Sequence, residues 1–318
     1  MRRTAISWLV VFAILIGGFV ASIAALNADL YSAHGFVRTY LDALARKDSA
    51  AALSIAGVGV EGSDALLSDA SLGELDAIEL VRDTQNADGT HTVVYDYTVG
   101  EGAGRETGRS EFHVQHRGTR FGVFNDWSFV ASPISTISVT VKHDNRFEVN
   151  GTELTEAGAY LVFTPGLYVV DHKSTFLEAE AANVAMTEPG TIVDATLDVR
   201  ANKDFVSTVQ DEVDGFLQDC AAQTVLQPTG CPFGRVINDQ VDGDPAWSIT
   251  SYPLIEIDPG KQVGNWLVVD AIGTANVDVT VRSLFDGSVQ QLDEPVPFTV
   301  SYTITFDGNK LVIDGVRS

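Results

Sequence analysis

The chain has 318 residues, with 43 Asp or Glu against 20 Lys or Arg, which gives a formal net charge of −23 at pH 7. A charge of this size and sign repels phosphate polymers and anionic lipid surfaces, so it argues against a nucleic-acid partner. The ordinary explanation is a well-solvated acidic surface, and a specific cationic partner is the alternative.

The first predicted element is a membrane-spanning helix over residues 5–26. This stretch contains no charged residue, and a helix of its length extends about 33 Å, enough to cross a hydrocarbon core of about 30 Å. Arg2 and Arg3 precede it, Trp8 lies near its start, and the first charged residue after it is Asp29. This asymmetry predicts a cytoplasmic stub over residues 1–4 and an extracytoplasmic location for the rest of the chain.

A cleaved secretory signal is the alternative interpretation of the same segment. The apolar core of such a signal usually has about 7–15 residues, fewer than here. Ser22-Ile23-Ala24 would nevertheless serve as a small-residue cleavage site. Under both interpretations the bulk of the chain lies outside the cytoplasm. A core helix of a cytoplasmic protein is disfavoured, because the segment is apolar on all sides.

Residues 31–132 are predicted to form an α+β domain. Apolar residues recur at helical spacing over 33–47, and Asp48 or Ser49 can cap a second helical stretch over 50–55. A loop with Gly57, Gly59 and Gly62 leads into segments with period-two alternation. Strands are expected at 92–99, 110–116 and 120–129, with turns at 100–108 and 117–119.

Residues 135–200 lack a helical period and are predicted to form a small β module. Their short apolar runs are interrupted by Asn150-Gly151 and Pro165-Gly166, two dipeptides that favour turns. Strands are expected at 137–141, 146–149, 161–163, 167–170 and 191–199.

Residues 203–318 are predicted to repeat the layout of residues 31–132, with a helix first and an antiparallel sheet after it. An apolar stripe from Phe205 to Cys220 has helical spacing. The two halves show no residue-by-residue repeat, so their likeness is one of layout. Strands are expected at 247–252, 266–271, 277–283 and 298–306, with Asp307-Gly308-Asn309 closing a hairpin into 310–313.

Cys220 and Cys231 are the two cysteines of the chain. In an oxidising compartment a pair this close is most simply a disulfide, and Pro228 and Gly230 let the intervening segment turn back. Closing such a loop stabilises the fold by about 3 kcal/mol in the chain-entropy model. A metal site would need further ligands, and no histidine follows Cys220.

The helix that reads Gly-Phe-Val-Arg-Thr-Tyr-Leu-Asp-Ala-Leu-Ala-Arg-Lys-Asp over 35–48, followed by a curled sheet, resembles NTF2-like or cystatin-like folds. One membrane span followed by NTF2-like and PEGA-like β modules is similar to the extracytoplasmic part of TcaA/YvbJ-type Gram-positive envelope proteins. Cys-Pro-Phe-Gly at 231–234, before a strand with Trp247, also resembles exported actinobacterial proteins. TcaA-like chains typically carry a cytoplasmic zinc ribbon, which Met1-Arg2-Arg3-Thr4 cannot form, so any role that depends on the ribbon is in doubt.

The resemblance implies an envelope-associated, non-catalytic protein and supplies no site residues. The predicted fold class is α+β: a single N-terminal transmembrane helix, then two NTF2-like or cystatin-like domains, each a helix with a curled antiparallel sheet, around a small β module. The predicted domains are 31–132, 135–200 and 203–318, the last with the disulfide.

Residues with potential for chemistry form no recognisable site. His113 and His116 are three apart on a predicted strand, so they are expected on opposite faces. Asn238–Asp244 resembles a calcium loop, but its twelfth position is Ile249 where a Glu is required, so a polar turn is favoured over weak calcium binding. Asn150-Gly151-Thr152 fits a glycosylation sequon as well as a turn. The sequence therefore predicts no catalytic, cofactor-binding or metal-binding residue, and no cofactor.

Some NTF2-like folds use an Asp and a Tyr in an apolar pocket for proton transfer, which draws attention to Asp96 between Tyr95 and Tyr97. Alternation along the strand sends Asp96 to the face opposite both tyrosines. We therefore expect a protein that is not an enzyme.

Two functions from different classes remain. The first is a non-catalytic envelope module that is tethered to the lipid bilayer by residues 5–26 and binds an envelope protein or a wall component. It predicts domain interiors filled by side chains and an exposed apolar patch elsewhere. The second is a small-ligand binding or sensing module, which predicts an open, apolar-lined cavity with a few polar groups.

Overall fold

The computed structural model describes residues 2–57, 62–308 and 310–315, so the predicted glycine loop and the predicted Asp307-Gly308-Asn309 turn lie partly outside the described residues. The chain folds into two compact units. The first contains residues 1–140, 146–171 and 181–197, and the second contains 141–145, 172–180 and 198–318. The predicted boundary near residue 135 therefore lies inside the first unit.

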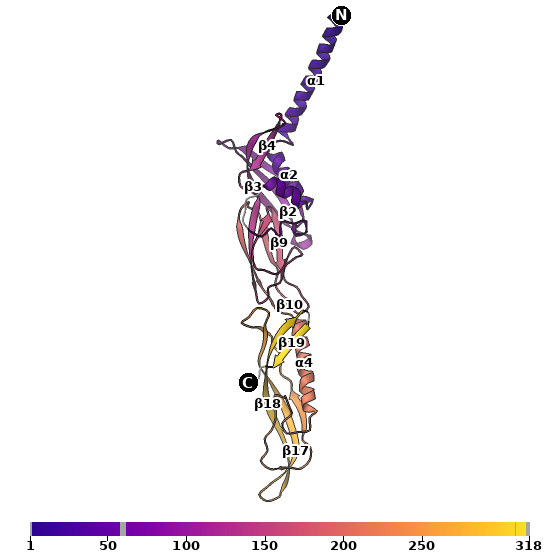
Figure 1. Cartoon of the computed structure of the whole chain (residues 1–318), viewed down its shortest axis with the longest axis vertical. Helices are drawn as coiled ribbons and strands as arrows, with labels where there is room; N and C mark the ends of the chain where they lie inside the picture. Colours follow the sequence, from indigo (N-terminus) through magenta and orange to yellow (C-terminus); the bar gives the residue numbers. More distant parts are fainter. Residues whose placement is uncertain (1, 58–61, 309, 316–318) are drawn as a thin grey trace. The chain divides into compact units, whose positions relative to one another are not determined.

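Helix α1 (Arg2–Ala28) is the long helix at the N-terminus in Figure 1. Its stretch Val11–Ala28 is long and apolar enough to cross a membrane, and none of it is buried in the protein. Side chains such as Phe12 and Phe19 are 62% and 65% exposed. An apolar helix without protein cover is suited to a lipid environment.

Two short helices follow α1, and each begins at a capping side chain. Ser32 accepts a hydrogen bond from the Gly35 amide at 3.0 Å and starts α2 (Ala33–Ala45). Asp48 accepts one from the Ala51 amide at 2.9 Å and starts α3 (Ser49–Ala56). These bonds satisfy amides that have no partner within the helix. Both predicted helices of this region are thereby confirmed.

The first sheet is antiparallel, in the order β1-β2-β3-β4, and its buried face packs against α2. Residues on α2, β2, β3 and β4 share one apolar core, in which Tyr40, Phe112 and Phe129 are in mutual ring contact. The strands are β1 (Leu75–Gln85), β2 (His91–Val99), β3 (Glu106–Arg120) and β4 (Phe124–Phe129).

Two details of the first sheet differ from the prediction. Strand β1 was not among the expected strands; it contains two register irregularities against β2 and buries few of its side chains, so it shows little alternation. The turn expected at 117–119 lies inside β3, where the register shifts between His116 and Gly118. The chain reverses instead at residues 121–123.

The β module of the first unit consists of a sheet in the order β11-β9-β6-β7 and a sheet in the order β12-β5-β8. Asn150 and Gly151 have φ of 48° and 79° between β6 and β7, which confirms the predicted hairpin turn. Leu161, Phe163 and Leu167 belong to the same core as Tyr40. The strands are β5 (Ile134–Lys142), β6 (Phe147–Val149), β7 (Thr152–Leu154), β8 (Gly158–Phe163), β9 (Gly166–Asp171), β11 (Ala182–Met186) and β12 (Ile192–Asp198).

The second unit contains helix α4 (Lys203–Ala221), which is capped by Asn202 and buries an apolar stripe that includes Phe205, Val209 and Leu217. Strands β17 and β18 pair along almost their whole length. The remaining strands of this sheet, β14, β15, β16 and β19, pair with β17 or β18. The strands of the unit are β10 (Leu177–Glu178), β13 (Arg200–Ala201), β14 (Gln240–Val241), β15 (Ala246–Ser251), β16 (Asp258–Pro259), β17 (Trp266–Arg282), β18 (Val289–Asp307) and β19 (Lys310–Gly315).

The segments 266–271 and 277–283, expected as two strands, are one continuous strand, β17. The apparent break at Gly273 has a packing reason. A Cβ atom at Gly273 would lie 2.4 Å from the ring of its cross-strand partner Phe298. The first sheet contains the same glycine–aromatic pair, since a Cβ at Gly108 would lie 2.5 Å from the ring of its cross-strand partner Tyr97. In both sheets an aromatic ring covers a glycine backbone, which permits curvature.

Candidate functional site

In the first α+β region, which consists of α2, α3 and strands β1–β4, the space between helix and sheet is filled by the protein's own side chains. The Tyr40 hydroxyl is fully buried and lies 3.1 Å from the Pro133 carbonyl oxygen and 2.8 Å from that of Thr164. The hydroxyl of Tyr95 donates to the His34 carbonyl at 2.9 Å. Tyrosines that would face a ligand in an open pocket are here bonded to the backbone. These side chains thus occupy the space between α2 and the first sheet.

Burial keeps these phenols neutral. Burial and the nearby Tyr168 raise the pKa of Tyr40 well above its usual value, against the hydrogen bond with Thr164. Burial also raises the pKa of Tyr95 to about 12. A phenol with such a pKa holds its proton at physiological pH, so these groups act as hydrogen-bond donors in the core.

Asp96 lies on the outer face of β2, as predicted, and is bonded there. Arg109 donates to both of its carboxylate oxygens, at 2.6 and 2.8 Å. This hydrogen bonding lowers the pKa of Asp96. The carboxylate is thus an ionised member of a surface ion pair, without access to the buried tyrosines, and it is unsuited to proton transfer in an apolar pocket.

A second carboxylate, Asp83 on β1, lies between two histidines. The Nδ1 atoms of His34 and His91 lie 3.0 and 2.7 Å from its two oxygens, and its side chain is 19% exposed. Partial burial raises the pKa of Asp83, but the hydrogen bonds from His91 and His34 outweigh it, and the net shift is downward. The group joins α2 to the first sheet.

The residues considered as possible metal ligands are distributed over separate contacts. Within the described residues, no group of three or more His, Cys, Asp or Glu side chains is placed to hold a metal ion. His113 is bonded to Thr92 and Glu111, while the ring of His116 contacts Trp127.

The calcium-like stretch beginning at Asn238 was expected to be a polar turn, but it contains the short strand β14, which pairs with β17. Asp239 accepts a hydrogen bond from the Leu284 amide at 3.2 Å, and Arg282 donates to Asp242 at 2.8 Å. Both carboxylates therefore fasten this segment to the end of β17.

The second unit contains an open groove between α4 and strands β18 and β19, with a volume of about 860 Å³. Phe216 and Pro232 contribute apolar surface and Glu212 a carboxylate, and burial raises the pKa of the Tyr302 hydroxyl. Unlike the interior of the first region, this space has both apolar and polar walls. The lining residues are Glu212, Val213, Phe216, Gly230, Cys231, Pro232, Thr299, Val300, Ser301, Tyr302, Ile313 and Gly315.

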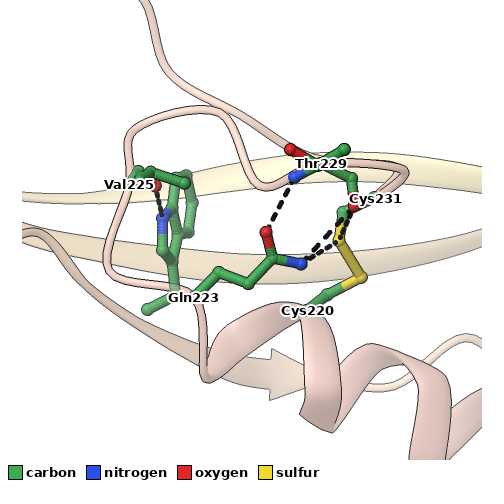
Figure 2. The surroundings of a disulfide bond; sticks show 6 residues. Cys220, Gln223, Val225, Thr229 and Cys231 are labelled. Atoms are coloured by element: carbon green, nitrogen blue, oxygen red, sulfur yellow. Dashed lines mark hydrogen bonds between the residues drawn. A yellow bond between two sulfur atoms is a disulfide. The ribbon is translucent and has the colours of Figure 1, made fainter.

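One wall of the groove is fixed by a disulfide. The sulfur atoms of Cys220 and Cys231 are 2.07 Å apart, so the end of α4 is joined to the following loop. As Figure 2 shows, the Gln223 amide lies inside this loop, where its Oε1 accepts from the Thr229 amide at 2.9 Å. The Val225 carbonyl accepts from Trp247 Nε1 at 2.8 Å. The loop is therefore held by a covalent bond and by side-chain hydrogen bonds to its backbone.

A second exposed feature of this unit is the β17–β18 turn. Phe285 is 99% exposed and Leu284 72% exposed at its tip. The turn is internally bonded: Ser283 Oγ accepts from the Phe285 amide at 3.2 Å, and Asp286 accepts from the Ser288 amide at 3.1 Å. A structured turn thus presents two large apolar side chains to solvent.

The sequence did not single out the groove or this turn. Groove residues come from four separated segments, so no local pattern links them. The turn did carry a signal, because Leu284-Phe285 interrupts a stretch of Ser, Asp and Gly that would otherwise be polar. Of the residues expected to orient the membrane helix, Trp8 is 74% exposed, and the side chains of Arg2 and Arg3 lie outside the description.

No protein-family model and no curated protein matches this chain. Among solved structures, the chain is similar to a protein described as an Ntf2 like protein involved in plasmid conjugation. The sequence identity is 10%, the TM-score is 0.15, and the match covers 76% of this chain and 75% of that chain. A likeness of this strength assigns no residue role.

Proposed function

We propose that this chain is a single-pass membrane protein in which the parts of both units after α1 lie outside the cytoplasm and bind an envelope protein or a wall component without catalysis. Arg2 and Arg3 precede the apolar helix and Asp29 follows it, which favours a cytoplasmic N-terminus. A disulfide is typical of an oxidising compartment. A relation to TcaA/YvbJ-type envelope proteins belongs to this proposal and rests on the order of the elements.

The observation that carries the binding function is the exposed pair Leu284 and Phe285 on a preorganised turn. Exposing large apolar side chains to water is unfavourable unless a partner covers them. Because the turn is already ordered by backbone amides that donate to the side chains of Ser283 and Asp286, little conformational entropy is lost on binding. Aromatic anchors of this kind contribute much of the free energy of binding in protein interfaces.

The test is photo-crosslinking of the full chain in its native membranes, with a benzophenone amino acid at position 285. The matched control is position 192, since Ile192 is also an exposed apolar residue, 73% exposed, on strand β12. We expect position 285 to give a discrete adduct that mass spectrometry identifies as an envelope protein or a wall fragment. Equal, diffuse labelling at both positions would contradict the proposal.

The open groove of the second unit supports an alternative, a small-ligand binding or sensing module. Its apolar walls with a few polar groups are the composition that ligand sites generally have. Native mass spectrometry of the full chain in detergent would detect a retained small molecule. The alternative predicts that Phe216→Ser releases this molecule and that Ile192→Ser retains it. Without any retained or stabilising compound from lipid and wall extracts, the alternative fails.

A further inference from the structure

Outside α1, the turn between β3 and β4 carries the most exposed large apolar side chain among the described residues of the first unit. Phe121 is 88% exposed and Val123 40% exposed. The Val123 amide donates to the Arg120 carbonyl at 3.3 Å, which closes the turn.

This turn is bonded to the end of α1. The side-chain amide of Asn27 donates to the Val123 carbonyl at 2.7 Å, and its oxygen accepts from the Asn125 amide at 3.0 Å. Asn27 directly follows the predicted membrane span at residues 5–26. The backbone of the turn therefore lies beside the point where the apolar helix ends.

Successive contacts show which way the hairpin runs. Trp127 Nε1 donates to the Tyr31 carbonyl at 2.9 Å, whereas Val123 and Asn125 contact Asn27, four residues earlier in the chain. From residue 127 back to residue 123 of the hairpin, the contacted residue changes from Tyr31 to Asn27, which lies closer to the membrane span. Phe121 lies two residues further on, a reach of up to about 7 Å. Phe121 is therefore within this reach of the Val123 backbone, which is bonded to Asn27 in the last turn of α1.

The conformation of the turn is an unusual one for a phenylalanine. Phe121 and Gly122 both have positive φ, 53° and 73°. Turns with positive φ at both central positions favour Asn, Asp and Gly, and a bulky side chain there is rare and strained. Strain of this kind persists where a side chain has a role to fulfil.

The charge around the turn departs from that of the whole chain. Residues 112–125 contain Arg117 and Arg120 and no Asp or Glu, although the chain as a whole has a net charge of −23. Both arginines are exposed, and Arg120 lies 3.6 Å from Asp126. Charges in water are screened beyond about 8 Å at physiological salt. A surface close to the turn is therefore influenced more by Arg117 and Arg120 than by acidic residues that lie farther away.

We infer that the β3–β4 turn is a second membrane contact, which inserts Phe121 and Val123 into the headgroup layer of the bilayer that α1 spans. Arg117 and Arg120 then face lipid phosphates, while their alkyl stems lie along the apolar boundary. The first unit is thereby held to the membrane at two points and has a fixed orientation on it. This inference rests on the proposed membrane anchorage.

The experiment uses the full chain in vesicles of phosphatidylcholine and phosphatidylglycerol at 3:1. Cys220 and Cys231 are joined to each other, so an introduced cysteine is the one free thiol for an environment-sensitive fluorophore. The variants are Phe121→Cys, Ile192→Cys as an exposed control, and Leu15→Cys within α1. A nitroxide near the top of the lipid acyl chain serves as the quencher.

We expect the label at position 121 to be quenched about twofold or more, as for a group at the acyl boundary, and the label at 192 to be unaffected. Quenching at 15 with none at 121 overturns the second contact and leaves the anchor intact. Absence of quenching at 15 overturns the anchorage itself, and the two failures are therefore distinguishable.

A second variant tests the arginines without altering the apolar tip. Arg117→Gln combined with Arg120→Gln, in the Phe121→Cys chain, removes both charges. We expect the quenching on 3:1 vesicles to fall to the value measured on pure phosphatidylcholine. Unchanged quenching on the anionic vesicles would show that lipid phosphates are not the partners of these arginines.

Discussion

The two α+β regions share a layout and differ in how they fill the space between helix and sheet. In the first, Tyr40 and Phe112 meet beneath α2 and the tyrosine hydroxyl is bonded to the backbone. In the second, α4 leaves a groove beside the disulfide, with Phe216 40% exposed. A helix on a curled sheet therefore does not by itself determine a binding site. The volume of the side chains in between decides it.

The largest difference between the regions is expected from truncating one aromatic residue in each. Tyr40→Ala removes a fully buried ring and is expected to lower the free energy of unfolding of the first unit by about 3–5 kcal/mol. Phe216→Ala removes a half-exposed ring and should cost less than about 1 kcal/mol. Hydrogen exchange read by mass spectrometry on peptides of each unit separates the two effects. Equal losses would mean that the groove is part of a packed core.

A subtler change at the same position tests the hydrogen bonds of the closed interior. Tyr40→Phe keeps the ring and removes the hydroxyl that the Pro133 and Thr164 carbonyls share. We expect a loss of about 1–3 kcal/mol, because buried carbonyls lose a partner. Denaturant titration of the same full chain measures it, and no loss would show that water satisfies these carbonyls.

The disulfide should stabilise the second unit alone. Replacing both Cys220 and Cys231 by serine is expected to cost about 3 kcal/mol by the loop-entropy model. Exchange protection should decrease in peptides of α4 and the loop that follows it, while α2 is unaffected. Loss of protection in α2 as well would show that the two units unfold together.

The glycine–aromatic pairs predict a likeness between the regions instead of a difference. Gly108→Ala and Gly273→Ala each force a methyl group against the ring of Tyr97 or Phe298. Both substitutions should destabilise their own unit by about 1–3 kcal/mol, as overpacking does. Alanine tolerated at one position only would mean that the two sheets curl for different reasons.

Helices and strands that have a clear local sequence pattern were mostly predictable. The apolar stripe beginning at Phe205 predicted α4, and the uncharged stretch 5–26 predicted an apolar N-terminal helix. Strand β1 was missed because its bulges at Asp76 and Leu80 break the alternation on which a prediction depends. A break between two strands was expected near Gly273. The residue whose ring covers this glycine, Phe298, is distant in sequence, so the local pattern did not reveal that the strand continues.

The candidate sites were less predictable than the fold. The groove joins α4 to β18 and β19 across about a hundred residues of sequence, so its walls are set by tertiary packing. The tight apolar turns at Phe121 and Phe285 carried a local signal, an aromatic residue where turn chemistry favours small polar ones.

The smallest expected effect concerns the pH dependence of the first unit. Hydrogen bonds from His91 and His34 outweigh partial burial and lower the pKa of Asp83. A carboxyl whose folded pKa is depressed stabilises the fold above its unfolded pKa, near 3.9, and this contribution is lost as pH falls through the folded value. Asp83→Asn should therefore weaken the first unit at neutral pH and flatten its acid unfolding below about pH 4. Denaturant titrations from acid to neutral pH, with Asp194→Asn at an exposed position of β12 as the surface control, measure this difference, and identical profiles would contradict it.

The central claim is that both units lie outside the cytoplasm on a membrane anchor. The most direct measurement is labelling of Ile192→Cys and Val236→Cys variants of the full chain, one exposed position in each unit, by a membrane-impermeant maleimide, in intact cells and after lysis. The account predicts full labelling in intact cells, with the chain recovered in membranes after an alkaline wash. Labelling that appears only after lysis would contradict it.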